Sequence, residues 1–184
     1  MEDDPELFYL MPEKELLEYV NYERFSSRRF MIPEESLEVE PFSPDPLTEA
    51  KVDRPYSPKA KKSKGEMECK QVLEDYFGKS FMTYRPDFIK DKRNLELDLF
   101  NPELGLACEY HGKQHYYYPS RFIKKKKVFV EQLRRDLYKL HKCKQLGIYV
   151  LVVPFTCKDI QQFIFDKLDS VPKFRSNYIR GLLM

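Results

Sequence analysis

The sequence predicts an α/β fold in which helices flank a mixed β-sheet, preceded by an extended N-terminal arm. Between residues 65 and 170, the hydrophobic pattern changes between helical and strand periodicity in the order helix, three strands, helix, strand, helix. The run IYVLVV at 148–153 is continuously apolar, as expected of a strand that is buried on both faces. The first 64 residues instead hold 8 of the 13 prolines and no glycine, a composition that interrupts long helices.

The helix that follows the arm carries its own start and stop signals. Ser63 is followed three residues later by Glu66, which is the spacing of a capping box. Gly78 is a typical helix stop, because glycine adopts the left-handed conformation without strain. Between these positions, apolar residues recur at helical spacing: Cys69, Val72, Leu73, Tyr76 and Phe77.

The other elements follow from the hydrophobic period and the turn residues. Strands are expected at 81–88, 94–100, 106–110 and 148–153, and helices at 128–146 and 159–168. The turn-rich sequence NPELG joins the second and third strands, and Gly147 ends the long helix. Because side chains alternate along a strand, one face of the second strand is predicted to hold Leu95, Leu97 and Leu99, and the other Glu96 and Asp98.

The N-terminal arm, residues 1–64, differs in charge from the rest of the chain. Residues 1–50 hold 14 acidic and 4 basic side chains, whereas residues 51–184 hold 28 basic and 16 acidic ones. The basic part is therefore expected to attract a polyanion. One short helix is predicted at 12–22. Large apolar residues of the arm are spaced as anchors for a partner protein or for this protein's own core: Phe8, Tyr9, Phe25, Phe30, Met31, Ile32 and Phe42.

Both boundaries of the predicted domain are marked by composition. The stretch KAKKSK at 59–64 separates the arm from the domain, and it resembles a short nuclear-localisation signal. Residues 171–184 are expected to form a C-terminal tail.

Composition also excludes several protein classes. The N-terminus MEDDPELF lacks the hydrophobic segment of a signal peptide, and no apolar run approaches the roughly 18 residues of a membrane span. The four cysteines have no zinc-binding spacing, so buried reduced thiols are expected. These features predict a protein of the cytoplasm, nucleus or virion that is not secreted, with no membrane partner and no small-molecule cofactor.

Two carboxylates are predicted to meet in the hairpin formed by 94–100 and 106–110. Antiparallel pairing through NPELG would bring Asp98 close to Glu109. Crowded carboxylates repel unless a proton or a cation lies between them. Mg²⁺ is the expected cation, with Mn²⁺ as an alternative, because hard divalent ions take oxygen ligands and polarise phosphodiesters. Glu66 is a third candidate, from the start of the first domain helix.

An HGKQH cluster and a polar helix stripe complete the candidate site. His115 is suited to proton transfer near neutral pH, and Lys113 to stabilising transition-state charge. Asp136 lies on the long helix as a further catalytic candidate. Four residues are expected to shape the site: His111, Gln114, Gln132 and Lys139. Taken singly, each of these residues has an ordinary structural explanation as a cap, a surface ion pair or a solvated group, and only the combination indicates a site.

A basic, aromatic segment follows the HGKQH cluster. Three tyrosines at 116–118 can stack on nucleic-acid bases, or contribute in part to the core. The expected phosphate-binding residues are Arg121, Lys124, Lys125, Lys126 and Lys127. A nucleic acid is therefore an expected partner of the domain, although such a lysine run is also common in solvated loops.

The combined motifs resemble a known nuclease family. The stretches SKGE, LELDLFNPELGLACEYHGKQHYYYPSRF and FVEQLRRDLYKLHKCKQLGIYVLVVPFT are similar to the very-short-patch-repair-like group of PD-(D/E)XK nucleases. That group includes homing endonucleases with an EDxHD site and proteins of phages and giant viruses. The resemblance covers about residues 63–165. It implies a restriction-endonuclease-like fold and Mg²⁺-dependent cleavage of DNA phosphodiesters.

The resemblance also implies roles for individual residues. By position, Asp98 matches the metal-binding aspartate, and Glu109 matches the (D/E) that supplies a second ligand. Glu66 matches the helix glutamate that orients water or the outer shell of the metal. His115 matches the histidine acid or base, and Asp136 matches the aspartate that follows it. The glutamine of the QxxRD motif, Gln132, matches a hydrogen-bonding residue that shapes the site.

One position departs from the usual (D/E)-x-K pattern, and two functions stay open. Two residues after Glu109 the chain has His111, and the next lysine is Lys113. The first function is a Mg²⁺-dependent DNA endonuclease. The second is a catalytically inactive endonuclease-like fold that serves as a nucleic-acid-binding or assembly subunit, for example of a large DNA virus particle. The acidic, proline-rich arm is typical of a subunit that extends across its neighbours.

Overall fold

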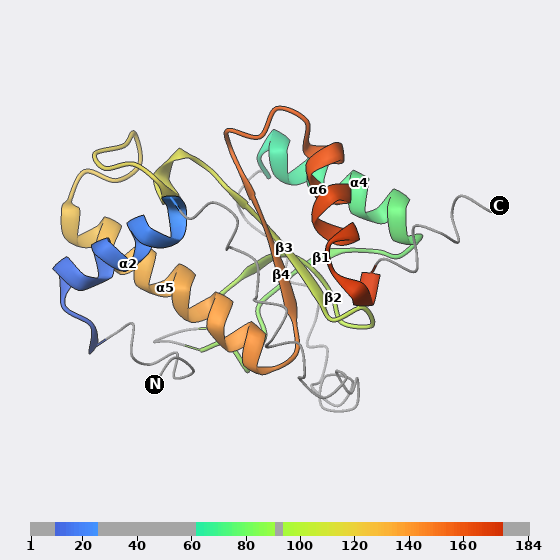
Figure 1. Ribbon diagram of the computed structural model, residues 1–184, viewed down its shortest axis with the longest axis horizontal. Helices are drawn as coiled ribbons and strands as arrows, with labels where there is room; N and C mark the ends of the chain where they lie inside the picture. Colours follow the sequence, from blue (N-terminus) through green and yellow to red (C-terminus); the bar gives the residue numbers. More distant parts are fainter. Residues whose placement is uncertain (1–9, 26–61, 91–93, 175–184) are drawn as a thin grey trace.

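A four-stranded mixed sheet forms the centre of the protein (Figure 1). The computed structural model describes residues 10–25, 62–90 and 94–174. The strands, in sheet order, are β1 (Met82–Tyr84), β2 (Leu97–Asn101), β3 (Leu106–His111) and β4 (Tyr149–Pro154). The first three strands pair antiparallel, and β4 pairs parallel to β3. This arrangement confirms the predicted mixed sheet.

Helices cover both faces of the sheet. On one face lie α4 (Lys64–Phe77) and α6 (Ile160–Asp169), which bury Leu73 and Ile164 in a shared apolar cluster with β3 and β4. On the other face lies α5 (Lys126–Gln145), which packs Tyr138 against residues of β2, β3 and β4. The predicted α/β class with flanking helices is therefore confirmed.

The capping signals of α4 act as the sequence predicts. The Ser63 side chain accepts a hydrogen bond from the Glu66 backbone N–H, and the Glu66 carboxylate accepts one from the Ser63 N–H, both at 3.2 Å. Gly78 ends the helix in the left-handed conformation, with φ of 62°. This box satisfies two backbone donors and fixes Glu66 at the first turn of α4.

The edge of the sheet near β1 is shorter and less regular than predicted. β1 covers Met82–Tyr84 rather than 81–88, and β2 starts at Leu97 rather than at residue 94. The pairing shifts between Met82, opposite Phe100, and Tyr84, opposite Leu97. The predicted alternation is wrong here, because this irregularity adds a residue to β2 and turns Leu97 to the α5 face, whereas Leu99 packs on the α4 face.

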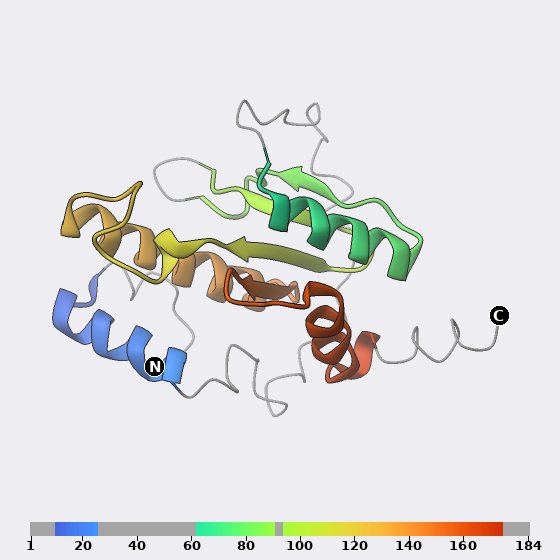
Figure 2. The ribbon, with the colours of Figure 1, turned by 90° about the horizontal axis from the view of Figure 1, so that it is seen from above.

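The helix predicted in the arm is present and packs on the domain. It is α2 (Glu13–Phe25), and Figure 2 shows it along α5, on the side away from the strands. Leu16 is fully buried in a cluster with residues of α5 and of the loop before it: Ile123, Phe129, Val130, Leu133 and Leu137. Lys126 and Glu13 add an ion pair of 2.5 Å. At least this part of the arm therefore uses the protein's own core as its docking surface.

The remainder of the arm, residues 1–9 and 26–61, lies outside the described residues. This range includes most of the predicted anchors and the first part of KAKKSK. At the other end, the packed domain reaches further than residue 170, because Val171 and Phe174 are buried in the cluster of α4 and α6. Residues 175–184 of the predicted tail lie outside the described residues.

All four cysteines carry free thiols. Cys69, Cys108 and Cys143 are buried, as predicted, and Cys157 is half-buried. Within the described ranges, no helix combines the length and the apolar character that a bilayer crossing requires.

The docking of α2 can be tested by removing its buried leucine. We expect Leu16→Ala to lower the free energy of unfolding by about 2–4 kcal/mol, because Leu16 is fully buried and its truncation opens a cavity. Leu10→Ala is the matched control, since Leu10 is 80% exposed and its truncation should change stability by at most about 0.5 kcal/mol. Chemical denaturation measures both. Equal effects of the two substitutions would contradict the docking of α2.

Candidate functional site

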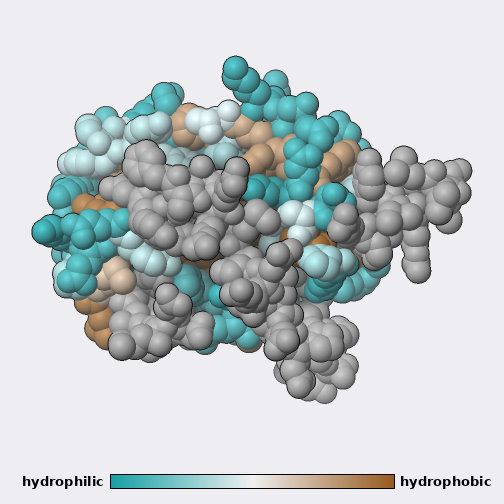
Figure 3. Space-filling view, viewed as in Figure 1, coloured by the Kyte–Doolittle hydropathy of each residue, from teal (hydrophilic) through white to brown (hydrophobic). Residues whose placement is uncertain are grey.

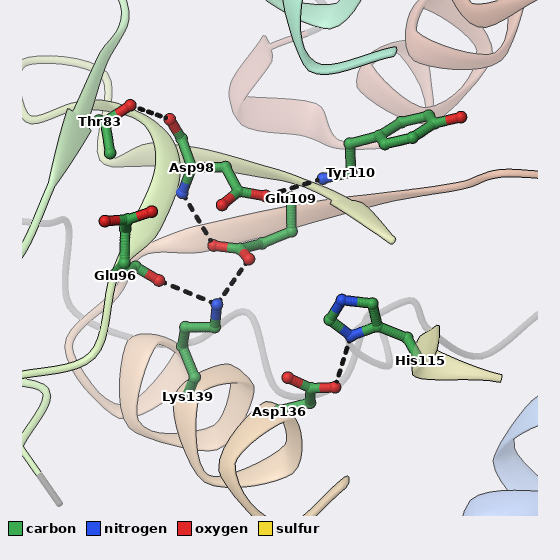
Figure 4. A network of polar contacts seen from close by, with 8 residues as sticks. All are labelled: Thr83, Glu96, Asp98, Glu109, Tyr110, His115, Asp136 and Lys139. Carbon is green, nitrogen blue, oxygen red and sulfur yellow. Dashed lines mark hydrogen bonds and ion pairs between the residues drawn. The ribbon is translucent and has the colours of Figure 1, made fainter. Parts of the chain in front are cut away.

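The β2–β3 hairpin brings Asp98 and Glu109 together, as the sequence predicts. Leu99 pairs with Cys108, so the two acidic residues are the next cross-strand neighbours. The Asp98 N–H donates to Glu109 Oε1 at 3.3 Å, and the Tyr110 N–H donates to Asp98 Oδ2 at 3.3 Å (Figure 4). Each carboxylate is thus held by the backbone of the opposite strand, which fixes their relative positions.

A lysine from α5 reaches this carboxylate pair from the face of the sheet that α5 covers. Lys139 Nζ lies 2.5 Å from Glu109 Oε2 and donates to the Glu96 carbonyl oxygen at 2.9 Å (Figure 4). The side chains of Lys139 and Glu109 are only 12% and 3% exposed. Lys139, expected only to shape the site, is therefore the buried cation at its centre.

The structure places Lys113, the predicted charge-stabilising lysine, away from the carboxylates. After His111 the chain enters a short 3-10 turn, η2 (Lys113–His115), which turns the Lys113 side chain to solvent. Lys113 does not line the cleft that contains the carboxylates. The positive charge that the sequence placed in the HGKQH cluster comes instead from α5.

His115 and Asp136 form the second polar pair of the site. His115 Nδ1 lies 2.8 Å from Asp136 Oδ2, which brings η2 against α5 (Figure 4). A carboxylate at Nδ1 favours the tautomer with its proton on that nitrogen, so Nε2 is left as the proton acceptor. The ring of His111 stacks on that of His115, with centroids 4.1 Å apart and an interplanar angle of 11°. His111 therefore supports the orientation of His115.

Burial and mutual repulsion raise the pKa values of three carboxyl groups. Burial, opposed by Lys139 and reinforced by Asp98, raises the pKa of Glu109 to about 8. The pKa of Asp98 is raised chiefly by burial, against the opposing effect of Lys139. Burial and the charge of Asp98 also raise the pKa of Glu66. The positive charge near Glu66, Asp98 and Glu109 is therefore too small to offset the effect of burial on their pKa values.

Asp136 behaves differently from these carboxyl groups. Burial acts to raise the pKa of Asp136, but the hydrogen bond with His115 and the charges of His111, His115 and Lys139 outweigh it, so its pKa is lowered. Asp136 is therefore the carboxylate that stays ionised and holds the imidazole. Glu109 therefore favours its protonated form, whereas Asp136 stays ionised and can orient the His115 ring as a base.

These groups line one cleft of about 310 Å³. Five acidic and three basic side chains contribute to its wall, so acidic charge exceeds basic charge. The lining residues are Glu66, Arg85, Asn94, Leu95, Glu96, Asp98, Glu109, Tyr110, Gln114, His115, Arg135, Asp136 and Lys139. Seven of the predicted site residues are therefore brought together in this cleft: Glu66, Asp98, Glu109, Gln114, His115, Asp136 and Lys139.

Glu66 reaches the cleft because α4 lies close to β3. A Cβ atom at Gly65 would fall 2.2 Å from the Tyr110 ring, so any other residue would displace the ring from this contact. Tyr110 directly follows Glu109 in β3. The capping box and Gly65 together therefore bring the first turn of α4 to the hairpin carboxylates.

Some predicted site residues lie elsewhere. Gln132 and His111 do not line the cleft, because Gln132 is one helical turn before Asp136 and His111 lies buried behind His115. The predicted phosphate-binding residues are exposed, in the loop before α5 and at its start: Arg121, Lys124, Lys125, Lys126 and Lys127. Hydrophilic residues predominate along this edge of the molecule (Figure 3). Lys126 is engaged with Glu13 of α2.

Other cleft residues were not predicted from the sequence as site residues. Arg85 follows β1, and its Nε lies 2.9 Å from Glu96 Oε2. Arg135 precedes Asp136 in the QxxRD motif, which was the available signal for it. For Arg85 and Glu96 the sequence offered no comparable signal, because they meet only through the fold.

The donor set fits a hard divalent cation better than a soft one. Asp98 Oδ1 receives no hydrogen bond from the described part of the chain, although the residue is mostly buried, and Glu109 and Glu66 lie nearby. Oxygen donors of this kind suit Mg²⁺ or Mn²⁺. Asp98 and Glu109 are therefore the residues that would hold the ion, with Glu66 beside them.

A second group of candidate ligands is less suitable. The donor atoms of His111, His115 and Asp136 lie within 4.8 Å of one another. Because the two imidazole rings are stacked almost parallel, their in-plane lone pairs lie in separate planes and cannot both point at one ion. The stack instead fixes His115 beside the carboxylates.

Similar sequences occur among viral proteins. The chain is 39% identical over 114 residues to Uncharacterized protein 033L of Invertebrate iridescent virus 3, and this alignment spans 59% of each protein. It is 33% identical over 132 residues to Uncharacterized protein 307L of Invertebrate iridescent virus 6, which covers 62% of this chain and 67% of that protein. It is 40% identical over 106 residues to Uncharacterized protein 094L of Frog virus 3 (isolate Goorha), covering 55% and 68%. No protein-family model and no solved structure matches the chain.

The raised pKa of Glu109 predicts a pH-dependent stability. Between its ordinary pKa of 4.5 and about 8, the folded protein holds a proton that the unfolded chain releases. In EDTA, the melting temperature should therefore fall as the pH rises from about 5 to about 8. Glu109→Gln should show a clearly smaller decline.

Glu103→Gln is the control for this measurement, because the Glu103 side chain is 70% exposed. This variant should retain the full decline of the wild type. If Glu109→Gln also retains it, the buried proton does not reside on Glu109.

Proposed function

We propose that this chain, which belongs to the family of viral proteins that includes 307L and 094L, is a Mg²⁺-dependent endonuclease that hydrolyses DNA phosphodiesters. One observation carries the proposal. A single cleft holds two neighbouring carboxylates, a buried ammonium group beside them and a histidine–aspartate pair. The sequence motifs that supply these groups resemble those of PD-(D/E)XK nucleases of the very-short-patch-repair-like group. We also propose that its α/β fold is of the restriction-endonuclease-like type.

The cation would be held by Asp98 and Glu109. When bound, Mg²⁺ supplies a Lewis acid that polarises the phosphodiester and lowers the pKa of a bound water. The raised pKa values of Asp98 and Glu109 support this role, because burial disfavours their ionised forms and a cation in the cleft would stabilise those forms. Glu66, at the first turn of α4, would orient water at the edge of the same cleft.

His115 is the proton-transfer group of the proposed reaction. Its Nδ1 is engaged by Asp136, so its Nε2 can accept the proton of an attacking water or donate one to the leaving oxygen. Asp136 acts through His115 by fixing the tautomer and stabilising the imidazolium. Stacking against His111 limits the rotation of the ring.

Lys139 supports the enzymatic role despite the missing lysine of the (D/E)-x-K pattern. In that pattern the lysine stands two residues after the acidic ligand, where this chain has His111. Lys139 instead places its ammonium group 2.5 Å from Glu109, from a different secondary-structure element. In the proposed reaction this ammonium group would stabilise the negative charge that develops on the phosphate.

The second candidate function is a catalytically inactive fold of the same kind that binds nucleic acid or serves in assembly. It is favoured by the exposed basic segment at 121–127, outside the cleft, and by the acidic arm. In either function DNA is the proposed partner, and the arm is a proposed contact for a protein partner. The proposed location is the cytoplasm or nucleus of the infected cell, or the virion.

Cleavage of supercoiled plasmid tests the enzymatic proposal. With Mg²⁺ or Mn²⁺ the wild type should relax or linearise the plasmid, and EDTA should abolish this activity. Asp98→Asn should reduce the rate at least about a hundredfold, because it removes the anionic metal ligand with little change in shape. Asp98→Asn activity equal to that of the wild type would show that the site is assigned wrongly.

Two lysine variants discriminate between the buried and the exposed ammonium group. Lys139→Met should lose most activity, whereas the matched change Lys113→Met should leave the rate within about twofold, since Lys113 lies outside the cleft. Salt-sensitive DNA binding by the wild type without cleavage in any metal would favour the inactive alternative instead.

A further inference from the structure

Three basic side chains line the cleft, and two of them are engaged by protein groups. Lys139 is bound by the Glu109 carboxylate and the Glu96 carbonyl oxygen. Arg85 pairs with the Glu96 carboxylate, 2.9 Å from its Nε. The positive charges of Lys139 and Arg85 are therefore already engaged by carboxyl groups of the protein.

Arg135 is the exception. Its side chain is half-buried in the cleft wall, yet it forms no hydrogen bond or ion pair with any residue of 10–25, 62–90 or 94–174. The carboxylate of its sequence neighbour Asp136 is bound to His115. A guanidinium group therefore lines an acidic cleft with its donors unused by the described part of the protein.

The chemistry of a guanidinium group identifies the ligand that fits it. Its planar array of N–H donors matches two oxygens of a phosphate group and keeps its charge at every physiological pH. A polyanion that enters a cleft with five carboxylates needs such a donor in addition to any cation. An arginine without a hydrogen-bond or ion-pair partner among the described residues is suited to that purpose.

The position of Arg135 on α5 indicates which phosphate it would meet. Lys139, beside the hairpin carboxylates, lies four residues further along the same helix, or about 6 Å along its axis. Arg135 therefore lies about one helical turn from the groups proposed to act on the scissile phosphodiester. That offset suits a neighbouring phosphate of the same strand.

We propose that Arg135 is a substrate-binding residue that holds the DNA backbone phosphate next to the phosphodiester in the cleft. The proposal rests on the proposed function for the identity of the substrate. It predicts that Arg135 contributes to DNA affinity whether or not the bond is cleaved. It also separates Arg135 from Lys139, whose charge is engaged by Glu109 in the absence of DNA.

The test measures DNA binding without cleavage. Fluorescence anisotropy with a short labelled DNA duplex, in buffer with Ca²⁺ in place of Mg²⁺ and at several salt concentrations, gives the affinity and its salt dependence. Arg135→Ala should weaken binding about tenfold and reduce the slope of log K against log salt by about 0.9, as for the loss of one phosphate contact. Arg135→Lys should retain most of the slope but not the full affinity, because lysine keeps the charge and loses the bidentate geometry.

Arg134→Ala is the matched control. It removes the same charge from the adjacent position of α5, but Arg134 does not line the cleft, so its effect on the slope should be clearly smaller. Equal slopes for Arg135→Ala and wild type, equal effects of the two alanine variants, or no salt-sensitive binding by the wild type would each overturn the proposal. Circular dichroism of each variant confirms that it is folded.

These outcomes are separable from failure of the proposed function. A wild type that binds DNA through Arg135 but cleaves in no metal would overturn the endonuclease proposal and support the phosphate contact. A wild type that cleaves, with a slope that Arg135→Ala does not change, would overturn the phosphate contact alone.

Discussion

The buried contact between Lys139 Nζ and Glu109 Oε2 is the interaction on which the rest of the site depends. It joins β3 to α5, and through the Glu96 carbonyl oxygen it also holds the chain that leads into β2. Both side chains are almost completely removed from water. Removing either partner from such a pair typically destabilises a protein by about 3–5 kcal/mol, because the other charge is left buried and unpaired.

Stability alone does not account for this pair. Replacing a buried ion pair by well-packed apolar side chains is often neutral or stabilising. The pair instead places an ammonium group and a carboxylate within a cleft that also holds Asp98, Glu66 and the His115–Asp136 pair. We infer that its value lies in the chemistry of the cleft, where one lysine balances only part of the acidic charge. The raised pKa values of the three carboxyl groups express the same imbalance.

Much of the fold was predictable because its signals are local. The capping box of Ser63 and Glu66, the stop at Gly78 and the NPELG turn each act within a few residues. The meeting of Asp98 and Glu109 followed from antiparallel pairing across that turn. The same logic failed for Leu97 and Leu99, because an irregular pairing with β1 cannot be recognised from alternation in β2 alone.

The parts of the site that were not predicted depend on contacts between distant elements. Sequence proximity to the carboxylates favoured Lys113 over Lys139 as the lysine that stabilises transition-state charge, but a 3-10 turn directs Lys113 to solvent, and Lys139 reaches Glu109 from α5. Arg85 and Arg135 share the cleft although 50 positions separate them. Helical periodicity placed Gln132 with Asp136, yet the cleft extends towards Lys139 and not towards the preceding turn.

We propose that a divalent cation binds at Asp98 Oδ1, which accepts no hydrogen bond from the described residues, with Glu109 and Lys139 beside it. A crystal soaked in Mn²⁺, with anomalous diffraction measured at the manganese edge, tests for this ion. We predict an anomalous peak within about 2.5 Å of Asp98 Oδ1 that is absent in crystals of Asp98→Asn. A peak between His111, His115 and Asp136, or no peak near the hairpin at saturating Mn²⁺, would contradict it.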